Sequence, residues 1–83
     1  MKKKIRQIVE SFEGGSNNLS ISEVRTLLKE YNFEHTRTSG SHEVWHNKEM
    51  GKRQVIVNKQ GQVARYIVKQ IIEKIREYYG HQI

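Results

Sequence analysis

Apolar residues near the N-terminus recur at helical spacing. They stand at i, i+3, i+4 and i+7, which is the pattern of one face of an amphipathic helix. These residues are Ile5, Ile8, Val9 and Phe12. Gly14 and Gly15 follow the pattern, and glycine commonly ends a helix. The sequence therefore predicts a short helix that ends at Gly14-Gly15, followed by a polar linker over residues 14–18.

A second helix is marked by its capping residues. Ser20 suits the N-cap, and Glu23 stands three residues later, as in a capping box. Leu19 and Val24 are spaced as the two members of a hydrophobic staple. Asn32 stands where a residue with left-handed backbone commonly ends a helix. The core stripe of this predicted helix is Val24, Leu27, Leu28 and Tyr31.

From Phe33 onward the apolar spacing changes from about 3.6 to about 2 residues, which is typical of strands. We predict three strands, over residues 33–38, 42–47 and 52–58. The turns between them are Ser39-Gly40-Ser41 and the residues around Glu49-Met50-Gly51. Both turns are short, so strands that are neighbours in sequence should pair in an antiparallel meander.

A last helix is predicted after the break at Gly61. Its apolar face is Val63, Ile67, Ile71, Ile72, Ile75 and Tyr79, which indicates a core helix of about four turns. The order of elements is helix, helix, three strands, helix. This order predicts an α+β fold in which two main helices cover one face of a three-stranded antiparallel sheet, with an extra N-terminal helix.

The sequence of the central strand does not determine which face of the sheet is covered by the helices. Alternation divides it into two sides, one with His42, Val44 and His46 and the other with Glu43, Trp45 and Asn47. Each side contains a large apolar residue. Either Val44 faces the core and Trp45 lies on the open sheet, where it could stack on bases, or Trp45 anchors the core.

The composition favours a polyanionic partner. The 83 residues include 15 Lys and Arg against 9 Asp and Glu, a formal net charge of +6 at pH 7. For so small a basic domain, nucleic acid is a more typical partner than a membrane. The length supports one domain, with residues 1–18 as a helical extension and linker and residues 19–79 as the core.

The chain has no cysteine, which excludes a disulfide framework and thiolate metal sites and suits a reducing compartment. The basic N-terminus could begin an export signal, but charged and polar residues interrupt the apolar positions that follow. We therefore expect a cytoplasmic protein with no membrane span.

The tripeptide Gly40-Ser41-His42 is the main candidate for chemistry. Gly40 can adopt positive φ at no steric cost, and Ser41 can hydrogen-bond locally. The turn could therefore hold His42 at the mouth of a strand, where an imidazole can act as an acid or a base. Taken alone, these three residues favour an ordinary surface histidine after a glycine turn, because histidines are common in loops.

With this turn the chain resembles the HicA family, the small toxins of HicA-HicB toxin-antitoxin pairs. The resemblance rests on Gly40-Ser41-His42 and the alternating strand after it, on Asn32-Phe33 at the preceding helix end, and on the closing helix. It covers residues 20–78. It implies a fold like that of double-stranded-RNA-binding domains and a ribosome-independent mRNA interferase activity. It also implies His42 as the catalytic residue and a HicB-like antitoxin as the partner.

Two positions depart from the family pattern. Asn32 stands where the family often has glycine, although asparagine also tolerates left-handed backbone. The third strand of the family commonly ends in a Pro-x-His segment, whereas this chain has Asn58-Lys59-Gln60 and no proline. If that second histidine assists catalysis or binding in relatives, Lys59 keeps only its charge, and this protein could be slower, altered in preference or inactive.

RNA can be cleaved without a metal ion when its own 2′-hydroxyl attacks the adjacent phosphate. The reaction needs a base, a proton for the leaving oxygen and positive charge beside the phosphate. His42 fits the first role, but the sequence identifies no second proton donor. His46 lies on the same strand face about 13 Å away, too far for both imidazoles to share a phosphate oxygen or a metal ion. We therefore expect no metal and no other cofactor.

Basic residues on the predicted third strand and last helix could supply the positive charge. The candidates for RNA binding are Lys52, Arg53, Lys59, Arg65 and Lys69. Two functions follow from the sequence. The first is a ribonuclease toxin that uses His42 and is neutralised by a HicB-type antitoxin. The alternative is a non-catalytic RNA-binding module of the same fold, in which the turn only contacts RNA backbone or 2′-hydroxyl groups.

Overall fold

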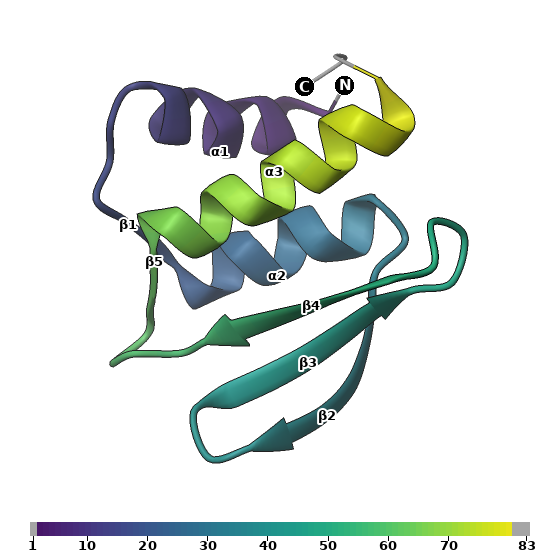
Figure 1. Ribbon diagram of the computed structural model, residues 1–83. Helices are drawn as coiled ribbons and strands as arrows, with labels where there is room; N and C mark the ends of the chain where they lie inside the picture. The colour runs from purple at the N-terminus through teal and green to yellow at the C-terminus, as the bar shows by residue number, and fades with distance from the viewer. Residues whose placement is uncertain (1, 81–83) are drawn as a thin grey trace.

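The computed structural model describes residues 2–80 of the chain. The elements in chain order are α1 (Lys3–Glu13), β1 (Asn18–Ser20), α2 (Ile21–Glu30), β2 (Glu34–Ser39), β3 (His42–Asn47), β4 (Lys52–Val57), β5 (Gln62–Ala64) and α3 (Arg65–Tyr79). Strands β2, β3 and β4 form an antiparallel sheet in that order, and β1 pairs with β5. In Figure 1, α2 and α3 lie over one face of the three-stranded sheet, and α1 lies on the far side of these helices.

This arrangement confirms the predicted α+β fold class, with a three-stranded antiparallel meander and two main helices on one face, as in double-stranded-RNA-binding-domain-like folds. The capping box of α2 is also confirmed. The Glu23 amide donates to Ser20 Oγ at 3.1 Å, and the Ser20 amide donates to Glu23 Oε1 at 3.2 Å. At the other end, Asn32 has left-handed backbone with φ of 67°. The helix itself ends at Glu30, so Tyr31 is its C-cap rather than its last turn.

The two-stranded sheet of β1 and β5 was not predicted. Leu19 lies opposite Val63 in this sheet, and both side chains are buried. The assignment of Val63 to the last helix was therefore wrong, because α3 begins only at Arg65. Each strand has three residues, too few to show a strand period.

The central strand places Trp45 in the core. Its side chain is only 2% exposed, and Glu43 and Asn47 on the same side are buried as well. The helices therefore cover the Trp45 side of β3. The other side, which carries His42, Val44 and His46, belongs to the open face of the sheet.

Two details shape the ends of the sheet. The pairing of β2 with β3 shifts register between His35 and Arg37, which marks a β-bulge in the edge strand. Strand β4 ends at Val57, one residue before the predicted end. The amide of Asn58 still donates to the Ser41 carbonyl at 2.8 Å, so the chain after β4 is tied to the turn between β2 and β3.

Helix α1 packs on α2 and α3 through the predicted apolar stripe, whose four residues are buried in the same core as those of the other helices. Polar contacts add to this packing. The Arg65 guanidinium donates to the carbonyls of Phe12 and Ser16, and Arg76 pairs with Glu13 at 3.0 Å. The N-terminal extension is therefore an integral layer of the folded structure.

None of the helices found between residues 2 and 80 is both long enough and apolar enough to span a bilayer.

Candidate functional site

The candidate histidine follows a two-residue loop. Gly40 and Ser41 connect β2 to β3, and Gly40 has a φ of 58°. A Cβ at Gly40 would meet no atom within 4 Å, so the position demands glycine for its backbone conformation and not for space. Two-residue hairpin loops with positive φ favour glycine for this reason. The loop makes His42 the first residue of β3, with an exposed side chain.

The open face of the sheet consists of three rows of residues that lie directly across from one another and therefore share a face. The rows are Ser39, His42 and Val57; Arg37, Val44 and Val55; and Glu34, His46 and Arg53. His42 thus stands between a serine and a valine. No titratable side chain lies directly opposite it on either neighbouring strand.

The predicted basic residues do not all gather around His42. Lys59 is at the same end of the sheet, one residue beyond the Asn58 amide that bonds to Ser41. Arg53 lies opposite His46, four residues along β3, and Lys52 lies opposite Asn47 at the far end. At ~3.3 Å per residue, these positions are about 13 and about 16 Å from the His42 end. Since alternate residues face opposite ways, Arg53 belongs to the open face and Lys52 to the other.

The two basic residues predicted on the last helix differ in their surroundings. Arg65 is partly buried, and its guanidinium lies 4.1 Å from the centre of the Phe12 ring. Its hydrogen bonds are made to carbonyls near the end of α1. Lys69 is exposed one turn further along α3. The structure thus gives Arg65 a role in fixing α1, while Lys69 faces solvent.

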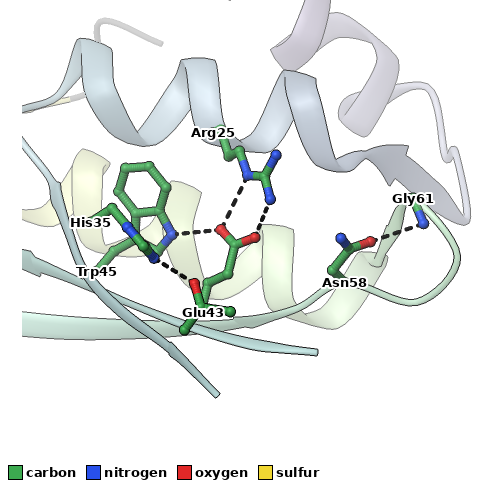
Figure 2. A network of polar contacts seen from close by, with 7 residues as sticks. Arg25, His35, Glu43, Trp45, Asn58 and Gly61 are labelled. Atoms are coloured by element: carbon green, nitrogen blue, oxygen red, sulfur yellow. Dashed lines mark hydrogen bonds and ion pairs between the residues drawn. The ribbon is translucent and has the colours of Figure 1, made fainter. Parts of the chain in front are cut away.

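A half-buried ion pair lies behind the start of β3, on the helix side of the sheet. Figure 2 shows Arg25 reaching from α2 to Glu43, with Trp45 beside them. Arg25 Nε donates to Glu43 Oε1 at 3.1 Å, a second guanidinium nitrogen pairs with the other oxygen, and Trp45 Nε1 donates to Glu43 Oε1 at 3.1 Å. The hydrogen bond from Arg25 is the main cause that lowers the pKa of Glu43 below its ordinary value; burial opposes this effect and the bond from Trp45 adds to it.

The contacts of Arg25 with Glu43 also affect the turn that precedes His42. Glu43 follows His42 directly and points to the opposite face, so the ion pair holds the start of β3 against α2. Sequence reasoning missed Arg25, because its partner lies 18 residues later in the chain. The available signal was an acidic residue on the same side of the strand as Trp45, since a buried carboxylate requires a cation or several donors.

Another histidine lies next to this network. The ring of His35 lies 5.3 Å from the Trp45 ring, and its Nε2 is 2.7 Å from Thr38 Oγ1. These residues, with Arg25 and Glu43, line a shallow depression of about 280 Å³ on the helix side of the sheet. His35 is therefore on the opposite face from His42. The contact between the two rings contributes to the packing of Trp45.

Across residues 2–80, no group of three or more His, Asp or Glu side chains is placed to hold a metal ion.

A family model described as the HicA toxin of bacterial toxin-antitoxin systems matches residues 21–76, from the first residue of α2 into the last turns of α3. The chain belongs to the HicA family. This finding confirms the resemblance noted in the sequence. Searches of curated proteins and of solved structures gave no significant match. As a HicA toxin, the protein belongs to a toxin-antitoxin system, and an antitoxin is its implied partner.

The HicA match includes the Gly40-Ser41-His42 turn and the whole three-stranded sheet, but not α1 or β1. The side chains that attach α1, Arg65 and Arg76, lie within the matched region. This HicA protein therefore combines the family core with an N-terminal layer held by residues of that core.

Proposed function

We propose that the protein is an mRNA interferase, an endoribonuclease that cleaves RNA without a ribosome or a metal ion and uses His42 as its catalytic residue. The observation that best supports this function is the position of His42. It is exposed at the first residue of β3, on the sheet face that no helix covers, and a two-residue loop fixes its backbone. An RNA strand can reach the imidazole there without displacing any part of the fold.

In the proposed reaction, the imidazole of His42 takes the proton from a 2′-hydroxyl of the RNA. The 2′-oxygen then forms a bond to the adjacent phosphorus, and the bond from phosphorus to the 5′-oxygen breaks. The products are a 2′,3′-cyclic phosphate and a 5′-hydroxyl, and the leaving oxygen takes up a proton from water. Of the basic residues predicted to bind RNA, Lys59 is the one at the same end of the sheet as His42, and it would stabilise the charge that develops on the phosphate.

One observation favours the second function, a non-catalytic RNA-binding module. The cross-strand neighbours of His42 are Ser39 and Val57, and neither supplies a titratable acid for the leaving oxygen. In this alternative the turn contacts phosphate or 2′-hydroxyl groups and no bond is cleaved.

The proposed partner is an acidic HicB-type antitoxin that covers the His42 end of the open face. The net charge of +6 favours such a protein, because complementary charge speeds association. The same charge favours mRNA as the substrate.

The test is RNA cleavage by purified protein in the presence of EDTA. We expect wild type to degrade single-stranded RNA and to spare DNA of the same sequence, which has no 2′-hydroxyl. His42→Ala should remain folded and inactive, since an exposed side chain contributes little packing. His46→Ala is the matched control, on the same face of the same strand. Equal cleavage by wild type and His42→Ala would refute the assignment, and RNA binding without cleavage would favour the module.

A further inference from the structure

Beside the His42 turn lies an open groove of about 520 Å³, at the junction of β4, β5 and the start of α3. Its lining includes Asn18, Val57, Lys59, Gln60, Gln62 and Tyr66. Val57 lies directly opposite His42 in the β3–β4 pairing. The groove therefore begins one strand away from the candidate catalytic residue.

Tyr66 presents an unusually accessible ring to this groove. It is 64% exposed, and no other side chain between residues 2 and 80 makes a hydrogen bond or ring contact with it. The tyrosines at the other end of α3 differ, because the rings of Tyr78 and Tyr79 lie 4.9 Å apart and both hydroxyls donate hydrogen bonds. Val57 and Ile67 add apolar surface to the groove beside Tyr66.

The turn between β4 and β5 forms a hydrogen-bonded rim of the groove. Gln60 and Gly61 have φ of 55° and 82°, and positive φ at both loop positions is typical of a tight type I′ turn. Lys59 and Gln62 exchange backbone hydrogen bonds of 2.9 and 3.1 Å across it. The Gly61 amide also donates to Asn58 Oδ1 at 2.9 Å (Figure 2).

This rim holds side chains that can recognise a nucleotide. The amide groups of Gln60 and Gln62 each carry donors and an acceptor, and Lys59 carries a positive charge. Among residues 2–80 none of these three side chains has a hydrogen-bond or ionic partner. The groove thus combines an exposed aromatic ring, free amide groups and a cation, which are the components of single-stranded RNA binding.

We infer that this groove is a nucleobase subsite for single-stranded RNA, next to the bond that His42 would cleave. The base stacks on Tyr66, the side-chain amides contact its edge, and Lys59 contacts the adjoining phosphate. The inference rests on the proposed function, since it takes RNA as the substrate. It adds the site at which this protein would select the nucleotide beside the cleaved bond.

The experiment measures binding of a short, fluorescently labelled single-stranded RNA of mixed sequence to His42→Ala protein by anisotropy. In this background, Tyr66→Ala should weaken binding about tenfold, because stacking on an aromatic residue contributes that much per base. Tyr66→Phe should bind as the parent does, since the ring remains. Tyr78→Ala is the matched control, an exposed tyrosine at the opposite end of α3.

A salt series separates stacking from phosphate contacts. Tyr66→Ala should leave the slope of log Kd against log salt unchanged, while Lys59→Ala should lower it by about one. Equal losses for Tyr66→Ala and Tyr78→Ala, or a loss with Tyr66→Phe as large as with Tyr66→Ala, would overturn the stacking role.

The outcomes distinguish this inference from the function on which it rests. If the parent binds RNA and Tyr66→Ala binds it equally well, the subsite is refuted while the ribonuclease proposal stands. If wild type neither binds nor cleaves RNA, the proposed function fails and the subsite fails with it. If Tyr66→Ala weakens binding of the antitoxin but not of RNA, the groove is a protein contact and the inference is overturned.

Discussion

The guanidinium of Arg65 lies over the ring of Phe12, 4.1 Å from its centre, and donates hydrogen bonds to two carbonyls near the end of α1. Arg65 is the first residue of α3, and Phe12 belongs to the last turn of α1. A residue within the HicA-matched region thus holds a helix that lies outside it. The contacts of the Arg65 guanidinium therefore hold α1 against α3.

We predict that Arg65→Ala lowers the free energy of unfolding by about 2 kcal/mol. The variant loses the cation–π contact and the hydrogen bond to the Ser16 carbonyl, while the Phe12 carbonyl keeps the Gly15 amide as a donor. Urea denaturation measures the change, with Lys69→Ala as the exposed control on the same helix, expected within about 0.5 kcal/mol of wild type. Equal stability of Arg65→Ala and Lys69→Ala would show that the contact contributes nothing.

The ion pair of Arg25 and Glu43 should make stability depend on pH. The hydrogen bond from Arg25 lowers the pKa of Glu43 below 4.5 in the folded state, so the folded protein holds its proton less tightly than the unfolded chain does. The resulting stability is fully present above about pH 4.5 and is lost as the pH falls through the folded pKa.

Glu43→Gln tests this dependence. At neutral pH the variant should be about 2 kcal/mol less stable than wild type, because Arg25 loses its charged partner. The loss is smaller than for a fully buried pair, since the Arg25 side chain is 41% exposed. Unfolding measured from neutral to acid pH should show a shallower decline for the variant. Parallel curves would contradict the assigned role of Glu43.

Arg53 and Lys52 should contribute unequally to RNA binding. Arg53 belongs to the open face with His42, whereas Lys52 belongs to the helix side. In the His42→Ala background, binding should weaken steeply with salt, and Arg53→Ala should weaken it more than Lys52→Ala. Each change should act across many RNA sequences, because phosphate contacts position the strand without reading it. A larger effect of Lys52→Ala would place the RNA on the other face.

Growth experiments test the toxic activity of the protein and its neutralisation by an antitoxin. Wild-type protein expressed alone should stop growth, and co-expression of an acidic HicB-type protein encoded beside it should restore growth. His42→Ala should be harmless and should still bind that protein, since one exposed side chain contributes little to a large interface. If cells tolerate high expression of stably folded wild-type protein, the result would contradict the toxin hypothesis and favour the RNA-binding module.

The sequence predicted those elements that are marked by a few neighbouring residues. Ser20 and Glu23 define the start of α2 because a capping box needs only four neighbouring residues. The β2–β3 turn follows from Gly40, whose left-handed backbone glycine adopts at no steric cost. The family resemblance rested on the Gly40-Ser41-His42 turn, on Asn32-Phe33 and on the closing helix, and the family match confirms it.

Features that depend on distant pairing could not be predicted. Glu43, on the buried side of β3, pairs with Arg25 of α2, and no residue near Trp45 in the sequence identifies that partner. Leu19 and Val63 were recognised as apolar, but their pairing joins segments 44 residues apart (63 − 19). Tyr66 lies off the apolar face of α3, so its importance emerges only when the β4–β5 turn places a groove beside it.

The loop before His42 can change in length more easily than β3 can change its register. An added residue at Gly40-Ser41 lengthens the hairpin loop. The pairing of β3 would persist, because the buried Trp45 and the ion pair of Glu43 with Arg25 fix which face of the strand meets the helices. A single in-frame codon insertion in this loop would therefore alter the backbone just before His42 and leave the core behind it intact.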